Sequence, residues 1–218
     1  MRHVAWILSI TGASLVLSGC ASMKTSDTAR TGVEQLLVSS AIDRSLDKVD
    51  LRPIAGAKVY LEQKYLDCVD KNYLVVAMHQ RLLRNNCTIV EKAEDAQVIC
   101  EVGSGGVGTD RHDLFVGVPK LSVPGMAVAI PEVKFFDRTR ANGTAKILVV
   151  AYDATTKQPV LNSGTQLARS DHKTWSVLGS GHIVSGSVPK ELEKATGEPE
   201  SVIPIPTTMA ASFSPTRK

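Results

Sequence analysis

The N-terminal apolar run is the feature that most limits what this chain can fold into. Arg2 precedes an apolar stretch over residues 4–17, and a Ser-Gly pair then leads to Cys20. A charged start, a short apolar stretch and small residues are typical of a secretory signal peptide, and the stretch is shorter than the about 20 residues of a membrane-spanning helix. We therefore expect residues 1–19 to be removed, so that the folded domain is built from the chain after Gly19.

The sequence Leu-Ser-Gly-Cys at the end of this run resembles the lipobox of bacterial lipoproteins. The resemblance implies cleavage between Gly19 and Cys20 and attachment of a diacylglyceryl group to the Cys20 thiol. Several acyl chains together hold a protein durably at a membrane. In enteric bacteria an Asp after the cysteine retains a lipoprotein at the inner membrane, and here Ala21 follows. We therefore expect a lipid anchor at the periplasmic face of the outer membrane, the alternative being an ordinary signal peptide or a buried helix.

Length and charge favour one envelope domain without a nucleic-acid partner. Removing residues 1–19 from the 218 leaves 199, and the formal charge falls from +3 to +2 because one arginine is lost. This length is typical of one domain, and no basic run points to nucleic acid. We expect a tether over residues 20–31, an α/β domain over residues 32–188, and a flexible tail rich in Pro, Ser and Thr over residues 189–218.

The order of the periodic segments predicts an α+β fold, with a single mixed sheet of about six strands and two main helices packed on it. Helical periodicity follows Thr31 as far as Arg52-Pro53, and it follows Asp70 as far as Asn85-Asn86. A tight turn is expected at Asn142-Gly143, and another at residues 154–157. Strand patterns cover residues 57–62, 87–91, 97–102, 133–138, 145–153 and 158–162.

Three cysteines remain once Cys20 carries lipid, in a compartment that permits disulfides. If residues 87–91 and 97–102 form a hairpin, Cys87 faces Cys100 and the two are a candidate disulfide, with Cys68 unpaired. The alternative is a pair of buried free thiols. We favour free thiols, because ordinary cross-strand pairs often do not satisfy disulfide geometry.

Three segments carry a further resemblance: YLVVAMHQRLLRNNCTIVE, the entry AEDAQ into the strand QVICEV, and AYDATTKQPVLNSG. They resemble the periplasmic α/β domain of several outer-membrane lipoproteins, among them the curli secretion-channel subunit, flagellar assembly lipoproteins and activators of peptidoglycan synthases. More narrowly, TARTGVEQLLVSSAIDRSLD and GTDRHDLFVGVPKLSVP are similar to a family of uncharacterised proteobacterial lipoproteins. The likeness covers roughly residues 28–185 and implies a structural domain, with Cys20 as the one functional residue.

Several polar motifs do not match a catalytic or cofactor site. Gly103–Gly108 has the spacing of a dinucleotide-binding loop, but Pro119 and its neighbours do not sustain the helix that must come next, so we expect a flexible loop and no nucleotide. No zinc spacing surrounds the loop residues that could bind metal, and no nucleophile elbow is present. We expect no enzyme activity, no cofactor and no metal. The polar residues concerned are Asp110, His112, Asp113, Asp171 and His172, all expected in solvated loops, and His79 at a helix boundary.

The segment over residues 114–133, LFVGVPKLSVPGMAVAIPEV, is nearly all apolar, and its prolines exclude a stable spanning helix. Long apolar loops are often interaction elements, whereas a crossover folded back over the sheet explains the composition equally well. The candidate interface residues are Leu114, Phe115, Val116, Val118, Leu121, Val123 and Met126.

Three functions fit these observations to different degrees. We favour a non-enzymatic accessory or scaffold lipoprotein in envelope assembly, whose partner is an unknown envelope protein or a second copy. A secretion-channel or pore subunit would extend the apolar segment as strands in a closed multimer, although its prolines interrupt regular alternation. An envelope hydrolase would require an acid–base pair or a metal that the sequence does not present.

Overall fold

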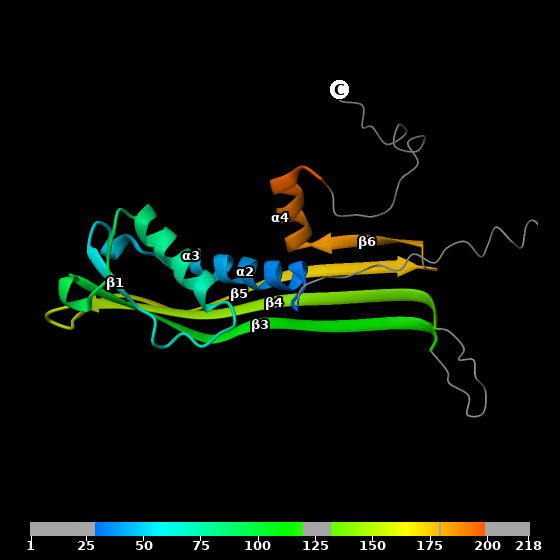
Figure 1. The fold of residues 1–218 in the computed structure, drawn as a ribbon, viewed down its shortest axis with the longest axis horizontal. Coiled ribbons are helices and arrows are strands. Elements are labelled where there is room, and N and C mark those ends of the chain that lie inside the picture. The colour runs from blue at the N-terminus through cyan, green and yellow to red at the C-terminus, as the bar shows by residue number, and fades with distance from the viewer. Residues whose placement is uncertain (1–28, 120–131, 179, 199–218) are drawn as a thin grey trace, which may run out of the picture.

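The fold is a single mixed sheet with helices on one face, so the predicted α+β class is correct (Figure 1). The computed structural model describes residues 29–119, 132–178 and 180–198. The described helices and strands are α2 (Gly32–Leu46), β1 (Lys58–Glu62), α3 (Lys71–Arg84), β2 (Thr88–Val90), β3 (Val98–Val118), β4 (Val133–Asp153), β5 (Pro159–Val177), β6 (Ser180–Gly186) and α4 (Ser187–Thr196), with 3-10 turns at Arg52–Ile54 and Ala93–Asp95.

The six strands lie in the order β2-β1-β3-β4-β5-β6. β1 pairs in parallel with both β2 and β3, and the remaining neighbours are antiparallel. The predicted hairpin between residues 87–91 and 97–102 is therefore wrong, because β1 lies between those segments. Cys87 and Cys100 are not cross-strand neighbours. Both are buried free thiols, and burial raises the pKa of the Cys100 thiol to about 12.

Helix α2 begins where the capping pattern predicts. The Thr31 hydroxyl accepts a hydrogen bond from the Glu34 amide at 3.0 Å, which satisfies one of the free donors of the first turn. The helix ends at Leu46 rather than at Arg52, where a separate 3-10 turn begins. Arg30 already belongs to the folded domain, because its guanidinium donates to both carboxylate oxygens of Asp70, so the predicted tether ends earlier than residue 31.

Helix α3 buries the fourfold-spaced residues Leu74, Met78 and Leu82, as their periodicity predicts. Asp70 is the N-cap residue, but its side chain makes no capping hydrogen bond because it accepts from Arg30 instead. The helix ends at Arg84, and Asn86 then adopts the left-handed conformation with a φ of 58°. Asparagine tolerates this conformation better than most residues.

Strand β4 is continuous through Asn142-Gly143, so the tight turn predicted there is wrong. A Cβ at Gly143 would lie 2.2 Å from the Leu37 carbonyl oxygen of α2. The glycine therefore allows the helix to approach the sheet rather than allowing the chain to turn. The turn predicted at residues 154–157 is confirmed between β4 and β5. Beyond Gly143, alternate β4 residues enter the core: Ala145, Ile147, Val149 and Ala151.

The domain extends further along the chain than the sequence pattern predicts. β5 continues to Val177, β6 comes after it, and the boundary expected between residues 188 and 189 falls inside α4. Val188 and Pro189 are buried, which ties this helix to the domain. Among the described residues, no helix has the length and apolarity needed to cross a membrane.

Candidate functional site

Strands β3, β4 and β5 extend beyond the helix that covers them (Figure 1). Helix α2 runs alongside β5, since Ser45 Oγ donates to the Gln166 carbonyl oxygen at 2.9 Å and Ser170 Oγ donates to the Leu37 carbonyl oxygen at 2.6 Å. The start of α2 thus points toward the end of β5. We call the part of the sheet beyond this contact the arm: residues 110–118 of β3, 133–142 of β4 and 171–177 of β5.

The arm has one face that turns away from the helices. Odd-numbered β4 residues such as Ala145 and Ile147 face the helices, so the even-numbered Arg138 and Arg140 face the other way. We call this second face of the arm its open face. The register aligns three rows across it, each given from β3 through β4 to β5: His112, Arg140 and Lys173; then Leu114, Arg138 and Trp175; then Val116, Phe136 and Val177 at the end.

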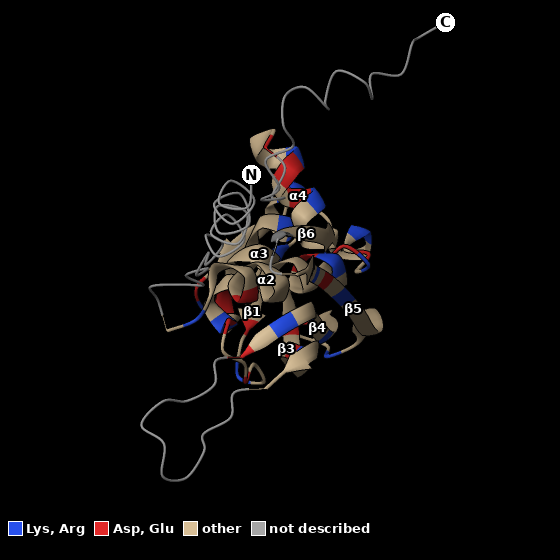
Figure 2. Cartoon of the chain, turned by 90° about the vertical axis from the view of Figure 1, so that its right-hand side faces the viewer, with Lys and Arg blue, Asp and Glu red and all other residues tan. Residues whose placement is uncertain are grey.

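The apolar side chains of these rows are exposed. Leu114 and Val116 each keep 57% of their surface, Trp175 keeps 37% and Val177 keeps 43%. Large apolar side chains scattered singly on a surface are ordinary, whereas neighbouring ones in adjacent rows form a contiguous patch. Figure 2 looks onto the end of the arm, with the Lys and Arg positions of its strands in blue.

The opposite face of the arm carries acidic and polar groups. Asp113 lies 2.9 Å from Arg111 and accepts a hydrogen bond from Thr139 Oγ1 at 2.7 Å. The Thr139 hydroxyl, together with Arg111, lowers the pKa of Asp113. Phe115 shares this face, and its ring lies 5.7 Å from the Lys134 ammonium. The two faces of the arm therefore differ in charge, because no acidic residue stands in the three rows of the open face.

The candidate interface residues fall into two groups. Leu114, Phe115, Val116 and Val118 are exposed and belong to the end of β3, not to a crossover over the sheet. Leu121, Val123 and Met126 lie outside the described residues. Their apolar partners on β4 and β5 were missed in the sequence, although alternation in KFFDRTRANGTAKILVV was the signal that could have revealed them. The missed exposed residues are Phe135, Trp175 and Val177.

The polar motifs expected in loops lie in strands instead. Gly103–Gly108 and residues 110–113 are part of β3, because their backbones pair with β4. Asp171 and His172 are part of β5, and His172 is buried rather than solvated. Across the described ranges, no three His, Cys, Asp or Glu side chains are grouped closely enough to hold a metal.

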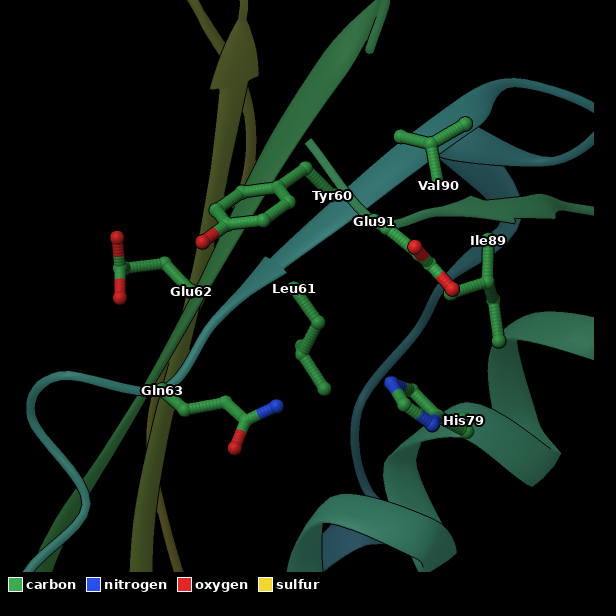
Figure 3. Close-up of a pocket in the computed structure, with 8 residues that line it drawn as sticks. All are labelled: Tyr60, Leu61, Glu62, Gln63, His79, Ile89, Val90 and Glu91. Carbon is green, nitrogen blue, oxygen red and sulfur yellow. The ribbon is translucent and has the colours of Figure 1, made fainter. Parts of the chain in front are cut away.

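A shallow cavity of about 320 Å³ lies where the parallel strands β1 and β2 end (Figure 3). His79 reaches it from α3 and lies below Leu61 and Ile89, while Glu91 comes from the segment after β2. Burial lowers the pKa of His79, which favours the neutral imidazole. The carboxyl ends of parallel strands are common ligand sites, but this lining offers one imidazole among mostly apolar chains and assembles no catalytic group.

The outer edge of β3 is open along the arm. β1 pairs with β3 only from Val98 to Glu101, and the Tyr65 carbonyl oxygen then accepts from the Ser104 amide at 3.3 Å. From Gly105 to Val118, no strand in the described part of the chain pairs with this edge. An unpaired strand edge presents free backbone donors and acceptors to another chain.

One family profile matches most of the chain. It represents a family of unknown function (DUF6655), and it aligns with residues 14–200. The match includes the whole described domain and the arm. No curated protein matches the sequence.

Proposed function

The chain belongs to the DUF6655 family of unknown function, and from that premise we propose that it is a membrane-anchored envelope lipoprotein that acts without catalysis, as an accessory or scaffold in envelope assembly. Cys20, at the end of the lipobox-like sequence, carries the lipid and holds the domain at the outer membrane. The arm makes the contacts through which the protein acts.

The observation that carries this proposal is the exposure of the arm. Phe115 keeps 41% of its surface and Val118 keeps 38%, at the end of strands that α2 does not cover. Exposed apolar side chains on regular strands offer contact area without an ordering cost, because pairing between β3 and β4 already fixes the backbone. This chemistry suits binding, and it offers no acid–base pair for a reaction.

Metabolic labelling tests the anchor. We expect cells grown with an alkyne analogue of palmitate to label the protein and to retain it in the outer-membrane fraction. The Cys20→Ala variant should lose the label and leave that fraction, while Cys68→Ala serves as the matched control. Labelling that survives Cys20→Ala would overturn the anchor.

Site-specific crosslinking tests the contact. A photoreactive amino acid at Phe115 should capture a protein partner, whereas the same group at the exposed Glu94, in the 3-10 turn after β2, should not. Equal capture at both positions would contradict a role for the arm. A partner captured only at Phe115 would support it.

A secretion-channel or pore subunit is the second candidate. It is favoured by the length of β3 and β4, 21 residues each, and by the open β3 edge from Gly105 to Val118, which could pair with a neighbouring copy. Native mass spectrometry of the acylated protein separates the two candidates. A closed multimer of many copies that conducts ions across a planar bilayer supports the channel, and a monomer or small complex supports the scaffold.

A further inference from the structure

We propose that the open face of the arm lies against an anionic membrane surface, with its last row among the lipid chains and its arginines at the headgroup phosphates. This inference rests on the proposed function, because the Cys20 anchor is what brings the domain to the membrane. It adds a second contact between domain and bilayer, and it fixes which face of the sheet is turned toward the lipid.

The side chains follow a definite order along the arm. The last row of the open face, Val116, Phe136 and Val177, is entirely apolar. The row behind it combines Leu114 and Trp175 with Arg138. Apolar groups at the leading end, tryptophan at the boundary and cations behind are typical of a surface that enters the interfacial region of a bilayer. A protein–protein interface has the opposite arrangement, because its centre is depleted of charge.

The charges of the two faces favour the same orientation. Among the described residues, Arg138 and Arg140 form no ion pair, so both guanidinium groups are available to phosphates. Lys173 contributes less, because its ammonium lies 2.8 Å from Asp171. The face toward the helices carries Asp113 among its rows, so an anionic surface favours the open face over the other one.

The anchor and the end of the arm are close enough to reach one membrane. From the α2 contact at Ser170 to Val177 the strand advances about 24 Å, at about 3.4 Å per residue. Gly32 lies five helical residues before Leu37, which places it about 7.5 Å toward the same end. The chain from Cys20 to Gly32 spans at most about 40 Å. A lipid at Cys20 and the last row of the arm can therefore occupy the same leaflet.

Trp175 makes the contact measurable in the acylated protein itself. The chain has two tryptophans, and the other, Trp6, lies in the segment proposed to be removed, so Trp175 is the single tryptophan of the mature protein. The acylated protein is reconstituted in vesicles of phosphatidylethanolamine and phosphatidylglycerol, with and without brominated acyl chains, and the fluorescence of Trp175 is recorded. We expect bromine to quench the emission about twofold or more, because the Trp175 row lies at the chain boundary.

Charge-reversed variants test the arginines. Arg138→Glu/Arg140→Glu should remove most of the quenching, whereas Lys146→Glu/Arg169→Glu should retain it. The control makes the same change in net charge, and both its residues lie on the same face of the sheet but outside the three rows. Vesicles of phosphatidylcholine alone should give weaker quenching, as should high salt, because the attraction is electrostatic. Circular dichroism of each variant verifies that the domain is folded.

The outcomes decide the proposal separately from the anchor. Intact mass establishes whether Cys20 carries acyl chains, and its failure overturns the proposed function. Absent quenching in anchored, folded protein overturns the membrane contact, and so does equal quenching in both charge-reversed variants. A blue-shifted emission that depends on protein concentration and not on lipid would assign the open face to a second copy instead.

Discussion

The two halves of strand β4 differ in burial although they share the same neighbours. Ile147 and Val149, in the half covered by α2, have no exposed surface, whereas Phe135, in the arm, keeps 49%. β3 pairs with β4 along both halves, so pairing does not explain the difference. Helix cover explains it, because α2 starts at Gly32 and lies beside the middle of the sheet. One strand thus serves a core at one end and presents a surface at the other.

Truncation of apolar side chains should separate the halves most strongly. Ile147→Ala removes a fully buried side chain and leaves a cavity, so we expect a loss of about 4 kcal/mol in the free energy of unfolding. Leu114→Ala, in the arm, should change it by less than about 0.5 kcal/mol. Urea unfolding of both variants measures this contrast. A large cost at Leu114 would mean that the arm is buried in solution against another surface.

The glycines of the sheet sharpen the same comparison. Gly143→Ala places a Cβ against the Leu37 carbonyl oxygen, and because α2 must shift we expect a loss of about 3 kcal/mol. At Gly108 nothing lies within 4 Å of an added Cβ, so Gly108→Ala should be nearly neutral. Thermal unfolding of the pair tests whether α2 cover ends where the structure places it. Equal losses would contradict that boundary.

The contact between α4 and α2 should have an intermediate effect. Ser40 Oγ donates to Glu191 at 2.6 Å and Arg44 pairs with the same carboxylate, so Glu191→Gln should destabilise the domain by about 1 kcal/mol after screening by solvent. Hydrogen exchange in residues 187–196 should rise with it. Unchanged exchange would show that Val188 and Pro189 alone hold α4.

The same contact predicts a dependence on pH. Burial raises the pKa of Glu191, but the bonds from Ser40 and Arg44 outweigh it and lower the pKa below the ordinary 4.5. A lowered pKa in the folded state means that the contribution is complete above the ordinary value and is lost as the pH falls through the lowered one. The difference in the free energy of unfolding between Glu191→Gln and the parent protein should therefore shrink from pH 7 to pH 3.

The smallest effect is expected in the arm. Thr139 and Arg111 lower the pKa of Asp113, but Arg111 and Asp113 both keep more than half of their side-chain surface. Exposed ion pairs contribute little, so Asp113→Asn should change the free energy of unfolding by less than about 0.5 kcal/mol. Urea unfolding measures it. A larger loss would indicate that this face of the arm is packed rather than solvated.

Several elements are predictable from local pattern. The Thr31 cap predicts the start of α2, and the fourfold spacing of Leu74, Met78 and Leu82 predicts α3, because these signals depend on neighbouring residues only. The turn at residues 154–157 is of the same kind. The six-stranded mixed sheet is also predictable from the order of the segments.

Other elements could not be read locally. Asn142-Gly143 has the composition of a turn, yet the close approach of Leu37, more than a hundred residues earlier in the chain, keeps it in β4. Gly103–Gly108 has the composition of a loop, yet pairing with β4 makes it a strand. The exposed rows of the arm were missed for the same reason. Each row joins residues of three strands, and only their register brings them together.

The sequence by itself determined the α+β class, the positions of α2 and α3 and the lipobox-like end at Cys20, since each depends on periodicity or on a short motif. The tertiary structure decided that β1 separates Cys87 from Cys100, and that the apolar run after Asp113 continues a strand. It also decided that the arm has an apolar and basic face. Strand pairing is non-local, so the register, and with it the identity of each face, is set by contacts between distant segments.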